Sequence, residues 1–460
     1  METYFLLMIS SLVFLGIGWN ASKYVTDFHG YILARKTYGV FALTATVVAS
    51  FVGGGFFIGT IEKAGTYGVA PAFALLGFTL QLLLTGLLFC KNIDRFQDCY
   101  TVGDIIRKAF GKRAQFFVGV LWISFSVGII TAQMAAMGKI ISVFTHFDYS
   151  SSLILAGVVV ITYCTLGGVR AVVATDVIQF IIVVTVLPLC FMKTLYLFSA
   201  NPMPIAHSLT SLPGDWGWPA LTFAFLGFVF GDALIAPVIQ RILMAKSSKQ
   251  AKLSFSIAAL ITIPLSFIAA SIGIYMVTLH PNIEPNLSLH YFLNHYFTGW
   301  EQAIVITALI ALIVSSADTY LNSTASVLVN DVILPLKRNM SDSLLLDISR
   351  IFTFCIGLLS IFFAISVQSI FDLLLYTYKF WGPIILIPIT CAFYNYRLTE
   401  RQFFSICFAG GVTVVVWNVL GIEDLVGIND LFAGLLVSFT AFVYIWRSRR
   451  ELILKRLVDA

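Results

Sequence analysis

The stretch that decides the fold runs from residue 38 to residue 60 and reads YGVFALTATVVASFVGGGFFIGT. It is apolar and uncharged throughout, and about 20 such residues suffice to cross the hydrocarbon core of a bilayer as a helix. Its middle carries three consecutive glycines, Gly53, Gly54 and Gly55. Because each glycine disfavours a helix by about 1 kcal/mol relative to alanine, the stretch predicts a membrane-spanning helix that is broken at mid-depth.

A second interrupted segment carries Gly231 and Asp232, followed by Pro237. It belongs to the seventh predicted span and the first segment to the second, and because their positions in the order differ by five, an odd number, the two segments cross in opposite directions. Two broken spans in corresponding places of two halves are typical of secondary transporters built from inverted repeats. The alternative is that the glycines only allow close helix packing. We expect two repeats of five helices, at residues 38–199 and 219–394.

The composition excludes a soluble globule. Hydrophobic residues make up 59% of the 460 residues and charged residues 11%, against roughly 25% charged in a typical soluble protein. Since lipid cannot satisfy free backbone groups, we predict an all-α polytopic membrane protein, with one transmembrane domain (1–446) and a basic cytoplasmic tail (447–460). Thirteen transmembrane helices are expected near residues 3–20, 38–60, 68–90, 114–143, 151–166, 173–199, 219–243, 253–279, 301–335, 347–367, 368–394, 402–420 and 430–446.

Lysine and arginine are distributed unevenly between alternate loops. Twenty-four of the 28, Arg241 among them, fall in the loops on one side of the predicted spans or in the C-terminal tail. Only Lys63 and Lys193 fall in the opposite loops. Because cytoplasmic loops are enriched in these residues, we expect a multi-pass protein of the cell (inner) membrane, with its N-terminus outside and its C-terminus in the cytoplasm.

The ninth predicted span presents an oxygen-rich face. Leu312, Ser315, Ser316 and Thr319 recur there at helical spacing, beside the intramembrane carboxylate Asp318. A small hard cation takes several oxygen ligands. These hydroxyls, together with carbonyls freed by the glycine break, would supply them. The alternative for an isolated Ser or Thr is a hydrogen bond to the carbonyl four residues earlier.

A second carboxylate, Asp176, lies at the predicted start of the sixth span, in the run Gly167-Gly168-Val169-Arg170-Ala171-Val172-Val173-Ala174-Thr175-Asp176-Val177-Ile178-Gln179. Two interpretations remain open. An acid in the first turn of a helix is favoured by the helix dipole, and a carboxylate inside a membrane is also a candidate for a functional site.

Taken together, these motifs resemble the sodium:solute symporter family. The resemblance rests on the triple-glycine span, on the Gly-Gly-x-x-Ala-Val-x-x-Thr-Asp-x-x-Gln pattern of residues 167–179, and on Ser315-Ser316-Ala317-Asp318 with Asn322. It covers nearly the whole chain. It implies a leucine-transporter-like core of ten helices and alternating access driven by sodium.

Matching the family's motifs onto this sequence also implies ion ligands. The main sodium site would use three carbonyls and two hydroxyls, those of Ala49, Val52, Leu312, Ser315 and Ser316. Some members hold a second sodium ion, which here would involve Asp176 and Thr319 together with Ser315, with Asp318 close by.

Other motifs are most similar to the choline-transporting branch of the family. A quaternary ammonium ion has no N–H group to donate and is bound by an aromatic cage. Matching the motifs places Phe51, Ile129, Ile235 and Leu374 at the cage positions. Only one of these four residues is aromatic, which argues against choline as the solute.

Few polar side chains are expected at mid-membrane depth. We assign Phe51, Gly53, Phe56, Gln133, Asp232 and Lys379 to the solute site. Lone charges at this depth are unfavourable, so Asp232 and Lys379 stand out. They either pair with each other as a structural bridge or bind the charged groups of a solute, and Lys379 would favour an organic acid or a zwitterion.

The leading hypothesis is a sodium-coupled symporter that imports a small polar organic solute, such as an organic acid, an amino acid or another zwitterion. The alternatives are a proton-coupled transporter of the same fold, with Asp176 and Asp318 as proton carriers, and a solute sensor that does not transport. Sodium, the solute and the lipid bilayer are the expected partners. We expect no enzymatic activity, no nucleic-acid binding and no obligate protein partner.

Overall fold

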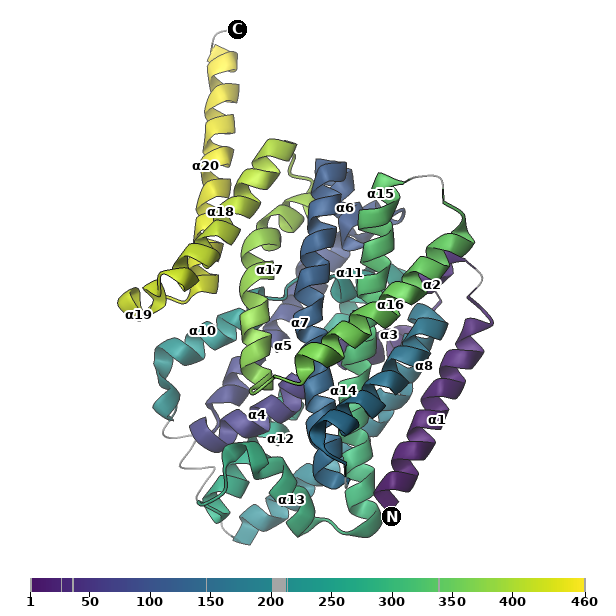
Figure 1. Ribbon diagram of the computed structural model, residues 1–460. Helices are drawn as coiled ribbons and strands as arrows, with labels where there is room; N and C mark the ends of the chain where they lie inside the picture. Colours follow the sequence, from purple (N-terminus) through teal and green to yellow (C-terminus); the bar gives the residue numbers. More distant parts are fainter. Residues whose placement is uncertain are drawn as a thin grey trace.

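The computed structural model describes residues 2–458, apart from 26, 35, 36, 146, 201–211, 213, 338 and 339. Arg35, Lys36 and Arg338, which contribute to the charge asymmetry, and the last two residues of the predicted tail lie outside the described residues. The described chain is entirely helical, as predicted (Figure 1). Its principal helices are α1 (Glu2–Ser22), α3 (Val40–Phe51), α4 (Gly54–Tyr67), α5 (Ala70–Leu84), α7 (Lys112–Phe144), α8 (Tyr149–Ala200), α10 (Gly217–Phe230), α11 (Ala236–Met244), α12 (Ser248–Leu279), α14 (Gly299–Val327), α16 (Asp342–Ala364), α17 (Ile370–Phe393), α18 (Glu400–Val419) and α20 (Asp430–Val458).

Ten helices among the described residues are long and apolar enough to cross a membrane, or eleven if the bent pair α3–α4 counts as one span. The predicted number of thirteen is therefore not reached by length and composition alone. One reason lies in α8, which runs through two predicted spans with a non-helical residue at Gly168 (φ 55°, ψ −154°). The other lies in α10 and α11, which are 14 and 9 residues long and each too short to span.

The first predicted break is present. α3 ends at Phe51, α4 begins at Gly54, and their axes differ by 49°. Val52 lies between them with φ −86° and ψ 83°. The Gly53 amide donates to the Phe51 carbonyl at 3.1 Å. In a continuous helix it would donate four residues back, to Ala49. The break therefore releases the Ala49 carbonyl for other partners.

The second predicted break separates α10 from α11. Residues 231–235 connect the two helices, and Leu234 adopts a positive φ of 56°. α17 packs across this connection: the Gly382 amide donates to the Gly231 carbonyl and the Trp381 indole to the Ala233 carbonyl, both at 3.0 Å. These bonds satisfy backbone groups that lipid could not satisfy, so an irregular segment is tolerated inside the bundle.

α14 forms the centre of the bundle. In its most apolar stretch 89% of the residues are buried, compared with 17% for α1 and 22% for α20, which lie at the periphery in Figure 1. α14 packs against α7, α8 and α3. The predicted oxygen-rich face thus lies on the most enclosed helix, next to the first break.

Close packing in this bundle depends on glycine at particular positions. A Cβ atom on Gly273 of α12 would lie 2.1 Å from the Ile61 carbonyl of α4. We expect Gly273→Ala to lower the stability by about 1–3 kcal/mol, because the two helices must separate. The measurement is the thermal unfolding midpoint in detergent. Gly227→Ala is the matched control, since its Cβ would meet the nearest atom at an ordinary 3.7 Å. Equal midpoints for the two variants would contradict the packing described here.

Candidate functional site

The first break and the hydroxyl face of α14 meet. Ser316 Oγ donates to the Ala49 carbonyl at 2.9 Å, and Ser315 Oγ lies 3.3 Å from the same oxygen. Ser315 Oγ is also 2.8 Å from the Leu312 carbonyl. Both serines are 1% exposed. Four of the five oxygens expected at the main sodium site therefore lie together in a buried cluster.

The fifth predicted ligand, Val52, occupies the break itself and is buried. The neighbouring Gly53 is so close to α14 that a Cβ atom there would lie 2.5 Å from Ser316 Oγ. Gln133 of α7 holds the other side of the break, because its Oε1 accepts from the Gly54 amide at 2.7 Å. The start of α4 is thus fixed between α7 and α14, and the break faces the serines.

Within the described residues, no group of three His, Cys, Asp or Glu side chains is placed to hold a metal ion. The cluster around Ala49 consists instead of neutral oxygens. Such a set suits a singly charged hard cation, because carbonyl and hydroxyl oxygens replace its hydration shell without adding formal negative charge.

Two of the residues assigned to a possible second sodium ion, Asp176 and Thr319, contact the guanidinium group of Arg241. Arg241 of α11 is 1% exposed. Its Nη2 lies 3.5 Å from Asp176 Oδ2 and donates to Thr319 Oγ1 at 2.7 Å. Thr46 completes the arrangement: it accepts from Arg241 Nη2 at 3.0 Å and donates to Asp176. The guanidinium group thus places a positive charge beside Asp176, where a possible second sodium ion was considered.

Arg241 was counted as a loop residue in the charge asymmetry, and this was wrong. Its side chain is enclosed by α3, α8 and α14, and Gln240 Oε1 accepts from its Nη1 at 2.6 Å. Gln240 and Arg241 lie on the short helix α11, which follows the second break. All residues of α11 are buried, so Arg241 lies inside the bundle and not in a loop.

Asp318 has partners other than a second ion. Its Oδ2 accepts from the Tyr163 hydroxyl at 2.5 Å and from Thr175 Oγ1 at 3.3 Å. Both donors belong to α8, so Asp318 joins α14 to α8. Its Oδ1 has no hydrogen-bond partner and, like the rest of the side chain, is buried.

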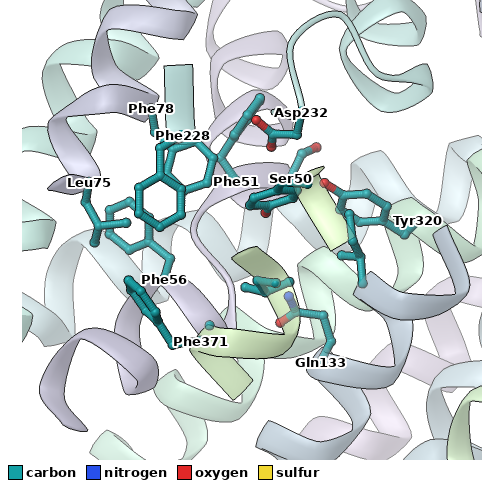
Figure 2. Close-up of a pocket in the computed structure, with 14 residues that line it drawn as sticks. Ser50, Phe51, Phe56, Leu75, Phe78, Gln133, Phe228, Asp232, Tyr320 and Phe371 are labelled. Carbon is teal, nitrogen blue, oxygen red and sulfur yellow. The ribbon is translucent and has the colours of Figure 1, made fainter. Parts of the chain in front are cut away.

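A central cavity lies beside the oxygen cluster around Ala49, between the two breaks (Figure 2). Its volume of about 10 Å³ is room for about one water molecule, so the surrounding side chains must move apart to admit a solute. Of the predicted solute-binding residues, Phe51, Phe56, Gln133 and Asp232 line it, whereas Gly53 and Lys379 do not. The other residues lining it are Ser50, Gly55, Leu75, Phe78, Ile129, Phe228, Tyr320, Phe371, Leu374 and Tyr378.

The aromatic lining was largely missed by the sequence analysis. Phe78, Phe228, Phe371, Tyr320 and Tyr378 come from four different helices, α5, α10, α14 and α17. An aromatic residue in an apolar span carries no local signal that separates cavity lining from ordinary packing. Only their positions relative to the two breaks distinguish these five, and those positions require the tertiary structure.

Asp232 lies in the second break and is fully buried. Gln81 of α5 donates to its Oδ1 at 2.8 Å, and its Oδ2 has no hydrogen-bond partner. Figure 2 shows its carboxylate beside Ser50 and Phe51 at the edge of the cavity.

Pairing of Asp232 with Lys379, one of the two interpretations left open by the sequence, does not occur. Lys379 Nζ lies 2.9 Å from Asp430 Oδ2, at the start of α20, and the Lys379 side chain is 20% exposed. α17 places Tyr378 toward the cavity, so its neighbour Lys379 lies on a different face of that helix. Lys379 therefore joins α17 to α20 and lies outside the cavity.

We expect Lys379→Met to weaken the fold by about 1–3 kcal/mol, because Asp430 is 1% exposed and would lose its cation. Stabilisation by sodium should be unchanged. Thermal unfolding with and without sodium measures both effects. Lys63→Met is the control, since its partner Asp372 is 59% exposed and remains solvated. Loss of the sodium effect in Lys379→Met would return Lys379 to the functional site.

Known transporters are similar to this chain in sequence. The high-affinity choline transporter 1 of Drosophila melanogaster is 28% identical over 369 residues, which cover 74% of this chain and 58% of that protein. The chain thus spans less than two thirds of the length of that relative. The osmoregulated proline transporter OpuE of Bacillus subtilis is 23% identical over 94% of this chain and 92% of its own.

Solved structures support the fold. A Na⁺-coupled sialic acid symporter, solved in a substrate-bound outward-open state, superposes with a TM-score of 0.79 over 96% of both chains at 18% identity. At this identity the similarity concerns the fold alone. The relatives named here are transporters rather than enzymes. The sequence model of the sodium:solute symporter family matches residues 31–410. The chain therefore belongs to the sodium:solute symporter family.

Proposed function

We propose that this protein couples the inward movement of one sodium ion to the uptake of a small organic solute by alternating access. The observation that carries the proposal is the convergence of Ser315 and Ser316 on the Ala49 carbonyl at the first break. An ion bound there would join α3 to α14. Because the central cavity adjoins the same break, ion and solute would stabilise the same arrangement of the helices, and each would strengthen the binding of the other.

The ligands of this ion are the carbonyls of Ala49, Val52 and Leu312 and the hydroxyls of Ser315 and Ser316. Each serine hydroxyl now donates to a backbone carbonyl. On ion binding, the hydroxyl protons would turn away so that the oxygen lone pairs face the cation, because an ion needs acceptors and not donors.

The proposed stoichiometry is a single sodium ion. The guanidinium group of Arg241 lies against Asp176 and Thr319 and compensates the charge of that carboxylate. A second sodium ion at this position would face the charge repulsion of Arg241. A sodium dependence with a Hill coefficient near one is therefore expected.

The architecture that we propose has thirteen spans, with inverted repeats at 38–199 and 219–394 inside one domain (1–446) and a tail at 447–460. The kink at Gly168 supports division of α8 into two spans, and the second break supports α10 and α11 as one interrupted span. The charge asymmetry supports an outer N-terminus and a cytoplasmic C-terminus in a cell membrane.

Uptake into proteoliposomes tests the function. Labelled choline, labelled proline and a labelled secondary amine are supplied in turn, with sodium outside and potassium inside. Accumulation should require the inward sodium gradient and should disappear when potassium replaces sodium outside. Accumulation driven equally well by a pH gradient without sodium would contradict sodium coupling and would favour the proton-coupled alternative.

A further inference from the structure

The charged groups that line the central cavity do not match the organic acid or zwitterion that the sequence had suggested as the solute. Among its described lining residues, Asp232 is the single carboxylic acid, and no lysine, arginine or histidine is present. Lys379, which had suggested an organic acid, pairs with Asp430 instead. An anionic solute would therefore meet a carboxylate and no cation.

Asp232 is itself incompletely satisfied. Gln81 donates to Oδ1, but the buried Oδ2 has no partner, and no ion pair with Asp232 occurs in the described part of the chain. Transfer of a carboxylate into a low-dielectric interior is strongly unfavourable unless it is paired. A cation bound in the cavity would offset this penalty, and Figure 2 shows the Asp232 side chain at the edge of the cavity, beside Ser50.

The remaining lining suits the apolar part of a cationic solute. Phe78 is packed among the other rings, with ring centroids 4.7 Å from Phe228 and 5.7 Å from Phe51. Tyr378 lies 6.2 Å from both Phe78 and Phe228. Aromatic faces attract cations as well as apolar groups. The cavity lining therefore combines one carboxylate with aromatic surface.

We infer that the solute of this protein is a small protonated amine, whose ammonium group donates an N–H hydrogen bond to Asp232 Oδ2 and whose hydrocarbon part packs on Phe51, Phe78 and Phe228. The inference rests on the proposed function and names the substrate class of the same site.

The carboxylate also distinguishes an amine from a quaternary ammonium ion. A quaternary ion cannot donate to Oδ2, so binding it would leave that oxygen unpaired. Of the four positions that match the aromatic cage of the choline branch, Phe51, Ile129 and Leu374 do line the cavity. Because two of these three are aliphatic, the cage is incomplete. The hydrogen bond to Asp232 then contributes more to the choice between an amine and a quaternary ion than the cage positions do. The carboxylate of a zwitterion would find no positive side chain here.

Thermal unfolding of the purified full-length chain in sodium-containing buffer tests this inference. Each probe has a five-membered ring: pyrrolidine as a protonated amine, N,N-dimethylpyrrolidinium as a quaternary ion, proline as a zwitterion and cyclopentanecarboxylate as an anion. Dimethylaminoethanol and choline provide a second, open-chain pair of tertiary amine and quaternary ion. Asp232→Asn removes the charge, and Asp372→Asn makes the same change on α17 at a residue that does not line the cavity.

We expect the protonated amine of each set to raise the unfolding midpoint most, and the midpoint shift to require sodium. Asp232→Asn should weaken the apparent affinity for the amine by about 100-fold, as expected when one partner of a buried charge pair is removed, while its response to sodium alone is retained. Asp372→Asn should behave like the wild type.

Three outcomes would overturn the inference. The first is that the quaternary ion, the zwitterion or the anion stabilises more than the amine. The second is that no amine stabilises although sodium does, and the third is that the amine effect persists in Asp232→Asn. In all three, the sodium response still supports the proposed symport. Absence of any sodium response in the wild type would instead overturn the proposed function itself.

Discussion

Replacement of Ser316 with alanine is expected to raise the sodium concentration for half-maximal stabilisation at least tenfold, or about 1.4 kcal/mol. The Ser316 hydroxyl is one of five proposed ligands and lies 2.9 Å from a second, the Ala49 carbonyl. Loss of one buried hydrogen-bonding or coordinating group to a charged species has an effect of about 1.5–3 kcal/mol. The measurement is the unfolding midpoint as a function of sodium, with potassium replacing it at constant ionic strength.

Ser323→Ala is the matched control for this prediction. Ser323 lies on the same helix and is also buried. Its hydroxyl donates to the Tyr320 carbonyl of the same helix rather than to a residue of the break. Its sodium response should equal that of the wild type. If the two alanine variants respond alike, Ser316 is not a ligand, and the proposed site is wrong.

Replacement of Arg241 with methionine is expected to have the largest effect on stability, about 3–5 kcal/mol, because Asp176 is then left as an uncompensated buried charge. Methionine retains much of the side-chain volume, so the loss concerns mainly charge and hydrogen bonds. The measurement is again the unfolding midpoint, together with the yield of monodisperse protein.

Asp176→Asn in the same chain should recover most of this loss. If Arg241 serves chiefly to balance Asp176, the two substitutions are strongly non-additive, and the double variant is more stable than Arg241→Met alone. Simple additivity of the two effects would show that Arg241 acts through Thr46, Thr319 and Gln240 rather than through the carboxylate.

The features that could be predicted from the sequence are those encoded locally. Three adjacent glycines oppose helix continuation wherever they occur, so the break between α3 and α4 was predictable. The hydroxyls of Ser315, Ser316 and Thr319 share a helix face by spacing alone. The family resemblance then placed Ala49 opposite them, and the structure brings Ala49, Leu312, Ser315 and Ser316 together.

The features that could not be predicted depend on contacts between distant segments. Lys379 pairs with Asp430 only because α20 packs on α17, and nothing near either residue indicates this. Arg241 resembles an ordinary loop cation in the sequence, and its burial follows from the shortness of α11 and its packing against α3 and α14. The pairing of Lys379 with Asp430 therefore removes the reason for favouring an organic acid or a zwitterion, and the protonated amine proposed above rests on Asp232 instead.

Equilibrium binding of radioactive ²²Na⁺ to the purified chain tests the central claim most directly, since it needs no knowledge of the solute. We predict one ion bound per chain in the wild type and in Ser323→Ala, and no measurable binding in a variant that carries both Ser315→Ala and Ser316→Ala. Undiminished binding in that double variant, or no binding to the wild type, would contradict the account.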